Sequence, residues 1–301
     1  MITNFETNKV YIAEGLKFPL YSDAANSLGT AFRNAMVKWE ELPFSQSPLH
    51  IWARDYMPIQ VNINKFVKFR YEPDYLKKYP EYKPNVDNIL NQLGIKVCHS
   101  TINLDGGNLI SCGDKAILTD KIFQENPQYG HTKLIDELAL LLEAEPVLVP
   151  WDKFEEYGHA DGMVRYMGGQ KVLLNNYCDF DKALRMRLLN ALSPHFQIEE
   201  LHYDCHTANS WAYINFLHIG NDIFVPMLNE KTDSIALAEI EAAYPLCQCH
   251  PVCNCEEIVK EGGALNCSTW NIAIDLPEED NRIRHQTDFS LVYKGHSLMV
   301  K

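Results

Sequence analysis

A cysteine that follows a glycine pair is the first residue of this chain whose setting suggests chemistry. Cys267 lies four residues after Gly263 in the segment EGGALNCSTWNI, residues 261–272, and leads into a β-prone run. Glycines let the backbone turn through conformations closed to other residues, so such a segment can deliver one side chain into a cleft. The thiol is therefore either a nucleophile or one of the buried cysteines that are common in protein cores.

Polar residues recur at nearly constant intervals ahead of this cysteine. Asp55, Asp105, His159, Asn215 and Cys267 are separated by 50, 54, 56 and 52 residues. A period of this kind marks repeated structural units. Five equivalent units would place the five side chains around one axis, where each unit contributes one group to a shared central cleft.

Four segments that accompany these residues predict β-hairpins. Each consists of two apolar strands joined by a short turn rich in Gly, Asn or Asp. They are PIQVNINKFVKF (58–69), GNLISCGDKAILT (107–119), GMVRYMGGQKVLL (162–174) and INFLHIGNDIFVPM (214–227).

Three of the hairpins are followed by predicted helices. The first two helices share an i, i+4, i+7, i+8 apolar stripe, and a capping cluster opens the third. The residues concerned are Leu134, Leu138, Leu141, Leu142; Leu184, Leu188, Ala191, Leu192; and Thr232, Asp233, Ser234. Returning strands are predicted at SPLHIW (47–52), IKVCHS (95–100), PVLVPW (146–151), QIEELHY (197–203) and CQCHPV (247–252). The repeating unit is therefore a strand, a helix, a strand and a hairpin.

Composition bounds the class of protein. The chain has 301 residues, 46% hydrophobic and 22% charged, which is typical of a globular protein with a sizeable core. Its net charge of -13, from 27 basic and 40 acidic residues, argues against nucleic acid or anionic membranes as partners. No signal segment or long apolar run is present, and nine cysteines are an odd number, so we expect a cytoplasmic protein with free thiols.

Five motifs carry a resemblance to a known family. WARDYMP, LDGGN, GHADGMVRY, YINF and GGALNC, in this order, resemble the guanidine-modifying pentein enzymes, closest to agmatine deiminases and bacterial-type peptidylarginine deiminases. The resemblance covers residues 52 to about 270. It implies an α/β fold, a five-bladed propeller of ββαβ units with pseudo-fivefold symmetry, with residues 1–301 as a single catalytic domain. It also implies covalent cysteine catalysis on an arginine-like guanidinium, with no metal and no other cofactor. The C-terminal extension, about 276–301, has no predicted role.

Two carboxylates are expected to bind the substrate. A guanidinium is planar and permanently cationic, and its paired N–H donors match a carboxylate through two parallel charge-assisted bonds. Asp55 and Asp161 are the residues that we predict for this role. Each aspartate has an alternative partner nearby in the sequence, Arg54 or Arg165.

The expected reaction is covalent. Cys267 would attack the guanidinium carbon, and His159 would protonate the departing nitrogen, so that ammonia leaves a covalent amidino-thioether. His159 would then activate water to release a ureido product. The bound cation and a protonated His159 would favour the thiolate. Asp105 is expected to orient His159, by analogy with the relatives, which commonly carry glutamate at this position.

Two further residues are candidates for the pocket. Asn215 is expected to bind the substrate, to bind the nucleophile loop, or only to satisfy the end of a strand. Trp52 either walls the pocket or packs in the core. Relatives commonly have glycine where Met57 stands and histidine where Asn266 stands. Because both changes touch the pocket, they bear on substrate identity more than on reaction type.

A metal site is the alternative for the run CQCHPVCNC. Its Cys247, Cys249, His250, Cys253 and Cys255 include ligand types that zinc prefers. The spacing of zinc knuckles is missing, however, and in a strand Cys247 and Cys249 would share one face. We therefore expect a core strand here.

The preferred function is hydrolysis of agmatine to N-carbamoylputrescine and ammonia, a step of putrescine biosynthesis, with a small cationic guanidino compound as partner. Deimination of peptidyl-arginine or of free arginine is the alternative reaction, and a non-catalytic pentein binding module is the alternative class. The loop YEPDYLKKYPEYKP, residues 71–84, is either a lid or an ordered surface excursion. The sequence leaves homo-oligomerisation open.

Overall fold

The computed structural model describes residues 1–43, 50–153, 157–204 and 207–275. The predicted C-terminal extension, 276–301, lies outside the described residues. In the described ranges, no helix combines the length and the apolar character that crossing a membrane requires.

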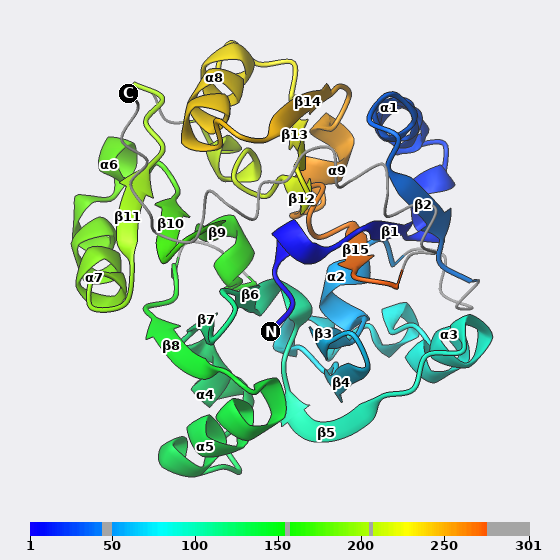
Figure 1. Ribbon diagram of the computed structural model, residues 1–301, viewed down its shortest axis with the longest axis vertical. Coiled ribbons are helices and arrows are strands. Elements are labelled where there is room, and N and C mark those ends of the chain that lie inside the picture. The colour runs from blue at the N-terminus through cyan, green and yellow to red at the C-terminus, as the bar shows by residue number, and fades with distance from the viewer. Residues whose placement is uncertain (44–49, 154–156, 205–206, 276–301) are drawn as a thin grey trace, which may run out of the picture.

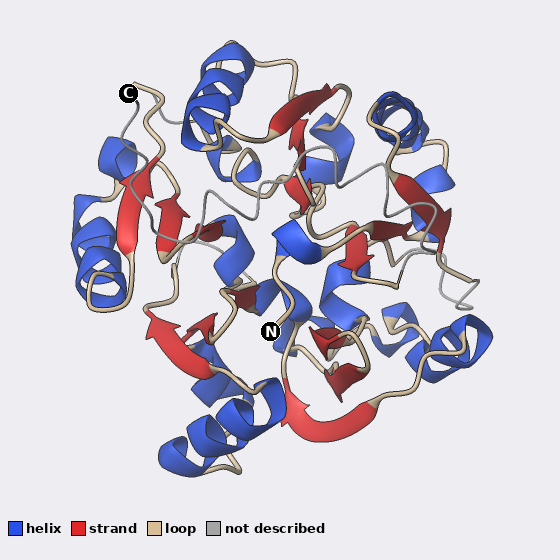
Figure 2. Cartoon of the chain, in the orientation of Figure 1, coloured by secondary structure: helices blue, strands red, loops and turns tan. Residues whose placement is uncertain are grey.

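Five three-stranded sheets make up the strand content of the described residues (Figures 1 and 2). In every sheet the central strand pairs antiparallel with one neighbour and parallel with the other. The sheets, in spatial order, are β3 (Ile59–Asn62), β4 (Lys65–Arg70), β5 (Cys98–Asn103); β6 (Ile110–Ser111), β7 (Lys115–Thr119), β8 (Glu145–Val149); β9 (Val164–Gly168), β10 (Lys171–Leu174), β11 (Gln197–Glu200); β12 (Leu217–Ile219), β13 (Asp222–Pro226), β14 (Gln248–Val252); and β15 (Thr269–Ile272), β1 (Lys9–Ile12), β2 (Lys38–Glu41). The predicted α/β class and the four predicted hairpins are confirmed.

A helix links the central strand of each sheet to its parallel neighbour, because a parallel pair needs a long crossover connection. With α2 and α9, which lie outside these crossovers, the helices in the described residues are α1 (Ser22–Asn34), α2 (Ala53–Tyr56), α3 (Val86–Leu93), α4 (Lys121–Glu125), α5 (His131–Leu142), α6 (Tyr177–Phe180), α7 (Lys182–Leu192), α8 (Asp233–Ala243) and α9 (Glu256–Lys260). Shorter 3₁₀ turns are η1 (Asn4–Glu6), η2 (Glu14–Lys17), η3 (Asp74–Leu76), η4 (Pro80–Tyr82), η5 (Gly106–Asn108), η6 (Ala160–Gly162) and η7 (Ser210–Ala212).

The fifth sheet joins segments from the two ends of the described chain. β15 pairs antiparallel with β1, and β1 pairs parallel with β2. This sheet was not predicted from the sequence, where a returning strand was expected at residues 47–52. Residues 44–49 lie outside the described ranges, and His50, Ile51 and Trp52 are not in a strand. That part of the prediction is wrong for residues 50–52, because the parallel partner of β1 is the earlier segment β2.

The long helices pack their apolar stripes against the sheets. Leu134, Leu138 and Leu142 of α5 are fully buried, and α7 repeats the arrangement. Burying each such side chain contributes roughly 1.5–3 kcal/mol. Figure 1 shows α1, α3, α5, α7 and α8 around the periphery, with the hairpins nearer the middle.

A short turn precedes each hairpin. α2 carries Asp55, while Asp105 and His159 are the residues that directly precede η5 and η6. Asn215 follows η7 closely, and Cys267 lies just before β15. The five periodic residues therefore occupy equivalent positions in the units, between a returning strand and the next hairpin.

Candidate active site

The nucleophile candidate is held by backbone and side-chain contacts. Cys267 is 6% exposed, and its Sγ donates to Asp161 Oδ2 over 3.4 Å. The Asn215 side-chain oxygen accepts the Cys267 backbone N–H at 3.3 Å, and the Asn215 carbonyl accepts the Asn266 N–H at 3.0 Å. The Asn266 side chain donates to the same Asp161 oxygen at 2.7 Å. Asn215 thus contacts the loop that presents the cysteine.

The histidine lies between two carboxylates. His159 Nε2 is 3.0 Å from Asp105 Oδ2, and His159 Nδ1 is 3.7 Å from Asp55 Oδ1. The side chain of Asp105, though shorter than glutamate, therefore reaches the imidazole. Asp55 is fixed in turn by the backbone N–H of Gly107, which donates to Oδ1 at 3.0 Å.

A pocket of about 600 Å³ opens onto this cluster. Cys267, His159, Asp161 and Asn215 contribute to its walls. Asp55, Asp105 and Trp52 are not among its lining residues, so the first two support the site from behind. Trp52 is half-buried and packs against the core, and its ring lies so close to Gly263 that a β-carbon there would be 2.2 Å away.

The neighbouring arginines do not neutralise the two aspartates. Arg54 donates to the Asn271 side-chain oxygen and to the Asn266 carbonyl. Arg165 donates to the Phe216 carbonyl at 3.0 Å and lies over the Phe216 ring. Neither Asp55 nor Asp161 forms an ion pair with an arginine in the described part of the chain. Asp55 lies beside His159 instead, and Asp161 accepts hydrogen bonds from Asn266 and Cys267.

Burial and mutual repulsion set the protonation of the cluster. Burial raises the pKa of Asp55 to about 7, against the opposing effect of His159. Burial alone would lower the pKa of His159, but Asp55, the hydrogen-bonded Asp105 and Asp161 outweigh it and raise that pKa to about 10. Burial, Asp161 and Asp55 raise the pKa of Cys267 well above its ordinary value. The protein's own groups therefore favour an imidazolium beside a neutral thiol.

Gly107 is required by close packing within the site. A β-carbon at this position would lie 2.6 Å from Asp55 Oδ1 and 2.7 Å from His159 Nδ1. We expect Gly107→Ala to displace both side chains and to lower kcat/KM by about 10²-fold, since small misplacements of reacting groups are costly. Gly130→Ala is the matched control, because nothing lies within 4 Å of a β-carbon there. Equal activity of the two variants, with both folded, would show that the packing at Gly107 is unimportant.

Tyr75 is a further residue of the site that was not predicted from the sequence. Its hydroxyl donates to Asp105 Oδ2 at 2.9 Å, and its ring meets the rings of Tyr157 and His159 edge-on. Burial and Asp105 raise its pKa well above the ordinary value, so it remains a donor. The signal available in the sequence was the tyrosine-rich loop 71–84, whose first half lies against the site.

The cysteine-rich run contains the expected strand. β14 covers Gln248–Val252, and Cys247 and Cys249 are half-buried against the largest hydrophobic cluster. Burial raises the pKa of Cys249 to about 12 and that of Cys247 to about 11. The eight described cysteines are free.

A cysteine, a histidine and carboxylates that meet at one pocket are the groups that an enzyme hydrolysing a C–N bond of a guanidino group requires. The particular family follows from the sequence: residues 2–272 match the model of the Porphyromonas-type peptidyl-arginine deiminases, and the chain belongs to that family. This assignment favours an enzyme over a non-catalytic binding module.

Relatives of known fold and name agree with this assignment. A Vibrio parahaemolyticus protein assigned as an agmatine deiminase is 24% identical over an alignment of 285 residues, with a coverage of 78% of this chain and 78% of that one. The agmatine deiminase of Enterococcus faecalis superposes with a TM-score of 0.72 at 17% identity, over 92% of this chain and 96% of that one. The agmatine deiminase of C. jejuni superposes with a TM-score of 0.70 at 15% identity, over the same shares. The chain therefore has the pentein fold of these deiminases.

Proposed function

We propose that this deiminase acts on agmatine, releasing ammonia and N-carbamoylputrescine through a covalent amidino-thioether on Cys267. The observation that supports the covalent route is the approach of Cys267 Sγ to Asp161 beside His159 in one pocket. In the proposed geometry, Asp161 binds the guanidinium within the pocket. Asp55, which lies beside His159 and does not line the pocket, adds to the negative electrostatic potential that attracts the cation.

The substrate itself would ionise the nucleophile. Burial, Asp161 and Asp55 raise the pKa of the Cys267 thiol, and a guanidinium bound to Asp161 would offset the charge of the two carboxylates. The thiol proton then leaves for solvent or a carboxylate, and the thiolate attacks the guanidinium carbon. His159, held as an imidazolium by Asp105, donates its proton to the departing nitrogen. The neutral imidazole next takes a proton from the water that hydrolyses the thioether.

The far part of the pocket favours an amine at the other end of the substrate. Asp152 and Asp181 line the pocket together with Tyr177, Phe180 and Trp211. Asp152 is buried, and its Oδ2 accepts a hydrogen bond from the Tyr177 hydroxyl at 3.1 Å. Among the described lining residues there is no lysine or arginine. A free amino acid would therefore bring its carboxylate close to the carboxylates of Asp152 and Asp181, whereas agmatine would bring an ammonium group.

The experiment is ammonia release from agmatine, free arginine and a blocked arginine peptide. We expect kcat/KM for agmatine to exceed that for arginine by about 10²-fold or more, because an unpaired buried carboxylate is costly. Asp152→Asn keeps the hydrogen-bond acceptor for Tyr177 and removes the charge. It should lower kcat/KM for agmatine about tenfold and leave that for the peptide unchanged. Preference for arginine or the peptide in the wild type would contradict agmatine as substrate but not deimination.

The proposal also covers the arrangement of the five sheets and the cellular compartment of the enzyme. We infer that the five sheets are the blades of one closed propeller with pseudo-fivefold symmetry, forming a single catalytic domain over residues 1–301. The equivalent positions of Asp55, Asp105, His159, Asn215 and Cys267 support this arrangement. Eight free cysteines among the described residues support a reducing, cytoplasmic setting. Agmatine is the proposed partner, without nucleic acid, membrane, metal or other cofactor in the reaction.

A further inference from the structure

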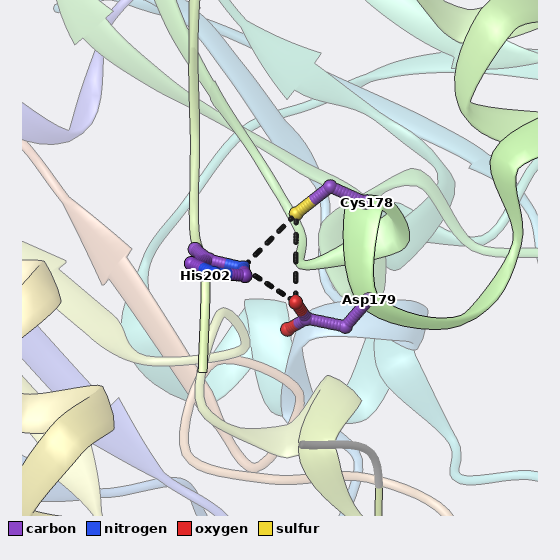
Figure 3. A group of neighbouring side chains, drawn as sticks. All are labelled: Cys178, Asp179 and His202. Atoms are coloured by element: carbon purple, nitrogen blue, oxygen red, sulfur yellow. Dashed lines mark hydrogen bonds and ion pairs between the residues drawn. The ribbon is translucent and has the colours of Figure 1, made fainter. Parts of the chain in front are cut away.

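A second group of reactive side chains lies outside the proposed catalytic cluster. Cys178 and Asp179 project from α6 toward His202, which follows β11 on a neighbouring extended segment (Figure 3). The ligand-type atoms of the three residues all lie within 4.8 Å of one another. Within the described residues, this is the group of three His, Cys, Asp or Glu side chains that is compact enough to hold one ion.

We propose that Cys178, Asp179 and His202 bind a zinc-type divalent transition metal. Cys178 Sγ is 3.6 Å from His202 Nδ1 and 3.8 Å from Asp179 Oδ1. Zinc ligated tetrahedrally by a thiolate and an imidazole separates sulfur and nitrogen by about 3.6 Å, given their usual bond lengths. The Cys178 sulfur therefore already lies at the distance from the His202 nitrogen that zinc coordination requires.

The third pair of ligand atoms, on His202 and Asp179, is in direct contact when no ion is bound. His202 Nδ1 and Asp179 Oδ1 are 2.5 Å apart, as in a direct hydrogen bond. An inserted zinc ion would separate them to about 3.4 Å. His202 can supply this movement, since its side chain is 55% exposed while that of Asp179 is buried. A water molecule would complete the fourth position on the exposed side.

Partners outside the triangle orient two of its members. His202 Nε2 lies 2.7 Å from Asp204 Oδ1, so the imidazole can donate to a carboxylate while its Nδ1 faces the metal. Metal-bound histidines commonly have such a carboxylate partner, which fixes the tautomer. The second oxygen of Asp179 accepts from the Asn176 side chain and from the Tyr203 backbone N–H, both at 2.9 Å. The first oxygen is thereby left directed at the proposed site.

Binding would displace protons and connect two segments. The thiol of Cys178 releases its proton to solvent, and so does His202 Nδ1 when protonated, because the ligands are thiolate and neutral imidazole. The ion would join α6 to the residues after β11. Tyr177 and Phe180 of the same short helix line the substrate pocket, so the metal would also restrain one wall of that pocket.

The test uses the full chain, stripped with a chelator, kept reduced with a phosphine and titrated with zinc or cobalt alone. We expect one equivalent of zinc to bind and to raise the melting temperature, and cobalt to give a thiolate-to-metal charge-transfer band. Cys178→Ser and His202→Gln should each weaken zinc binding by at least about tenfold, and Cys178→Ser should abolish the band. Since His202 is exposed, its variant is expected to fold even where the cysteine variant does not.

Cys249→Ser is the matched control, because Cys249 is another half-buried thiol with a strand position outside the cluster. It should retain both the zinc affinity and the cobalt band. A band that persists in Cys178→Ser, or that disappears in Cys249→Ser, would place the thiolate ligand elsewhere and overturn the proposal. Failure of the wild type to bind either metal would overturn it equally. None of these measurements depends on deiminase activity.

Discussion

Replacing Cys267 by alanine is expected to lower kcat for ammonia release by roughly 10⁴-fold or more, because the proposed reaction has no other nucleophile. The substitution removes one buried Sγ atom, whose hydrogen bond to Asp161 is long at 3.4 Å. The fold should therefore survive. Ammonia release from saturating agmatine measures the effect, and mass spectrometry of the quenched wild-type reaction should detect the amidino-thioether that the variant cannot form.

Cys112→Ala is the control for the loss of a buried thiol. Cys112 is buried to a similar degree, and it lies in the cluster formed by β6, β9 and their neighbours rather than beside His159. This variant should keep near wild-type activity. If Cys267→Ala retained substantial turnover, Cys267 would not be the nucleophile. If both variants lost turnover, the loss would reflect the removal of a buried thiol in general, and the amidino-thioether detected by mass spectrometry would decide.

Replacing Asp161 by asparagine should move two observables in opposite directions. The variant loses the carboxylate proposed to bind the guanidinium, so kcat/KM for agmatine should fall by about 10²–10³-fold. The same carboxylate raises the pKa of Cys267. Its removal should lower that pKa and speed alkylation of Cys267 by neutral iodoacetamide at a fixed, mildly alkaline pH, by up to about tenfold for each pKa unit.

Turnover and labelling with peptide mapping measure the two effects in the same protein sample. Asp87→Asn is the matched control, since Asp87 is an exposed aspartate that pairs with Lys68 on the surface. It should change neither quantity. A joint fall of turnover and of Cys267 labelling in Asp161→Asn would contradict the electrostatic role given to Asp161 and would indicate a structural one.

The local units of this fold could be predicted from the sequence because they depend on neighbouring residues. Apolar strand segments joined by turns rich in Gly, Asn or Asp predicted the hairpins, and leucines at helical spacing predicted α5 and α7. The fifth sheet could not be predicted in this way. It joins β1 to β15, and the pairing of Lys9 with Ile272 depends on a contact between distant segments.

The candidate site, too, could be predicted from the sequence only in part. The spacing of Asp55, Asp105, His159, Asn215 and Cys267 predicted that they would gather, since repeated units of equal size place equivalent residues on one axis. The spacing could not say which atoms meet. Whether Asp55 faced an arginine or a histidine was decided by packing across units, as was the contact of Tyr75 with Asp105.

Residue types and their order along this chain were enough to identify the family and the kind of reaction, because motifs depend on short stretches of sequence. Tertiary structure alone decided the protonation of Cys267 and His159, which depends on burial and on charges brought from distant segments. It alone also brought Asp152 and Asp181 to the pocket and His202 to Cys178. Distances of a few ångströms determine electrostatic and coordination energies, and folding sets those distances between residues far apart in the sequence.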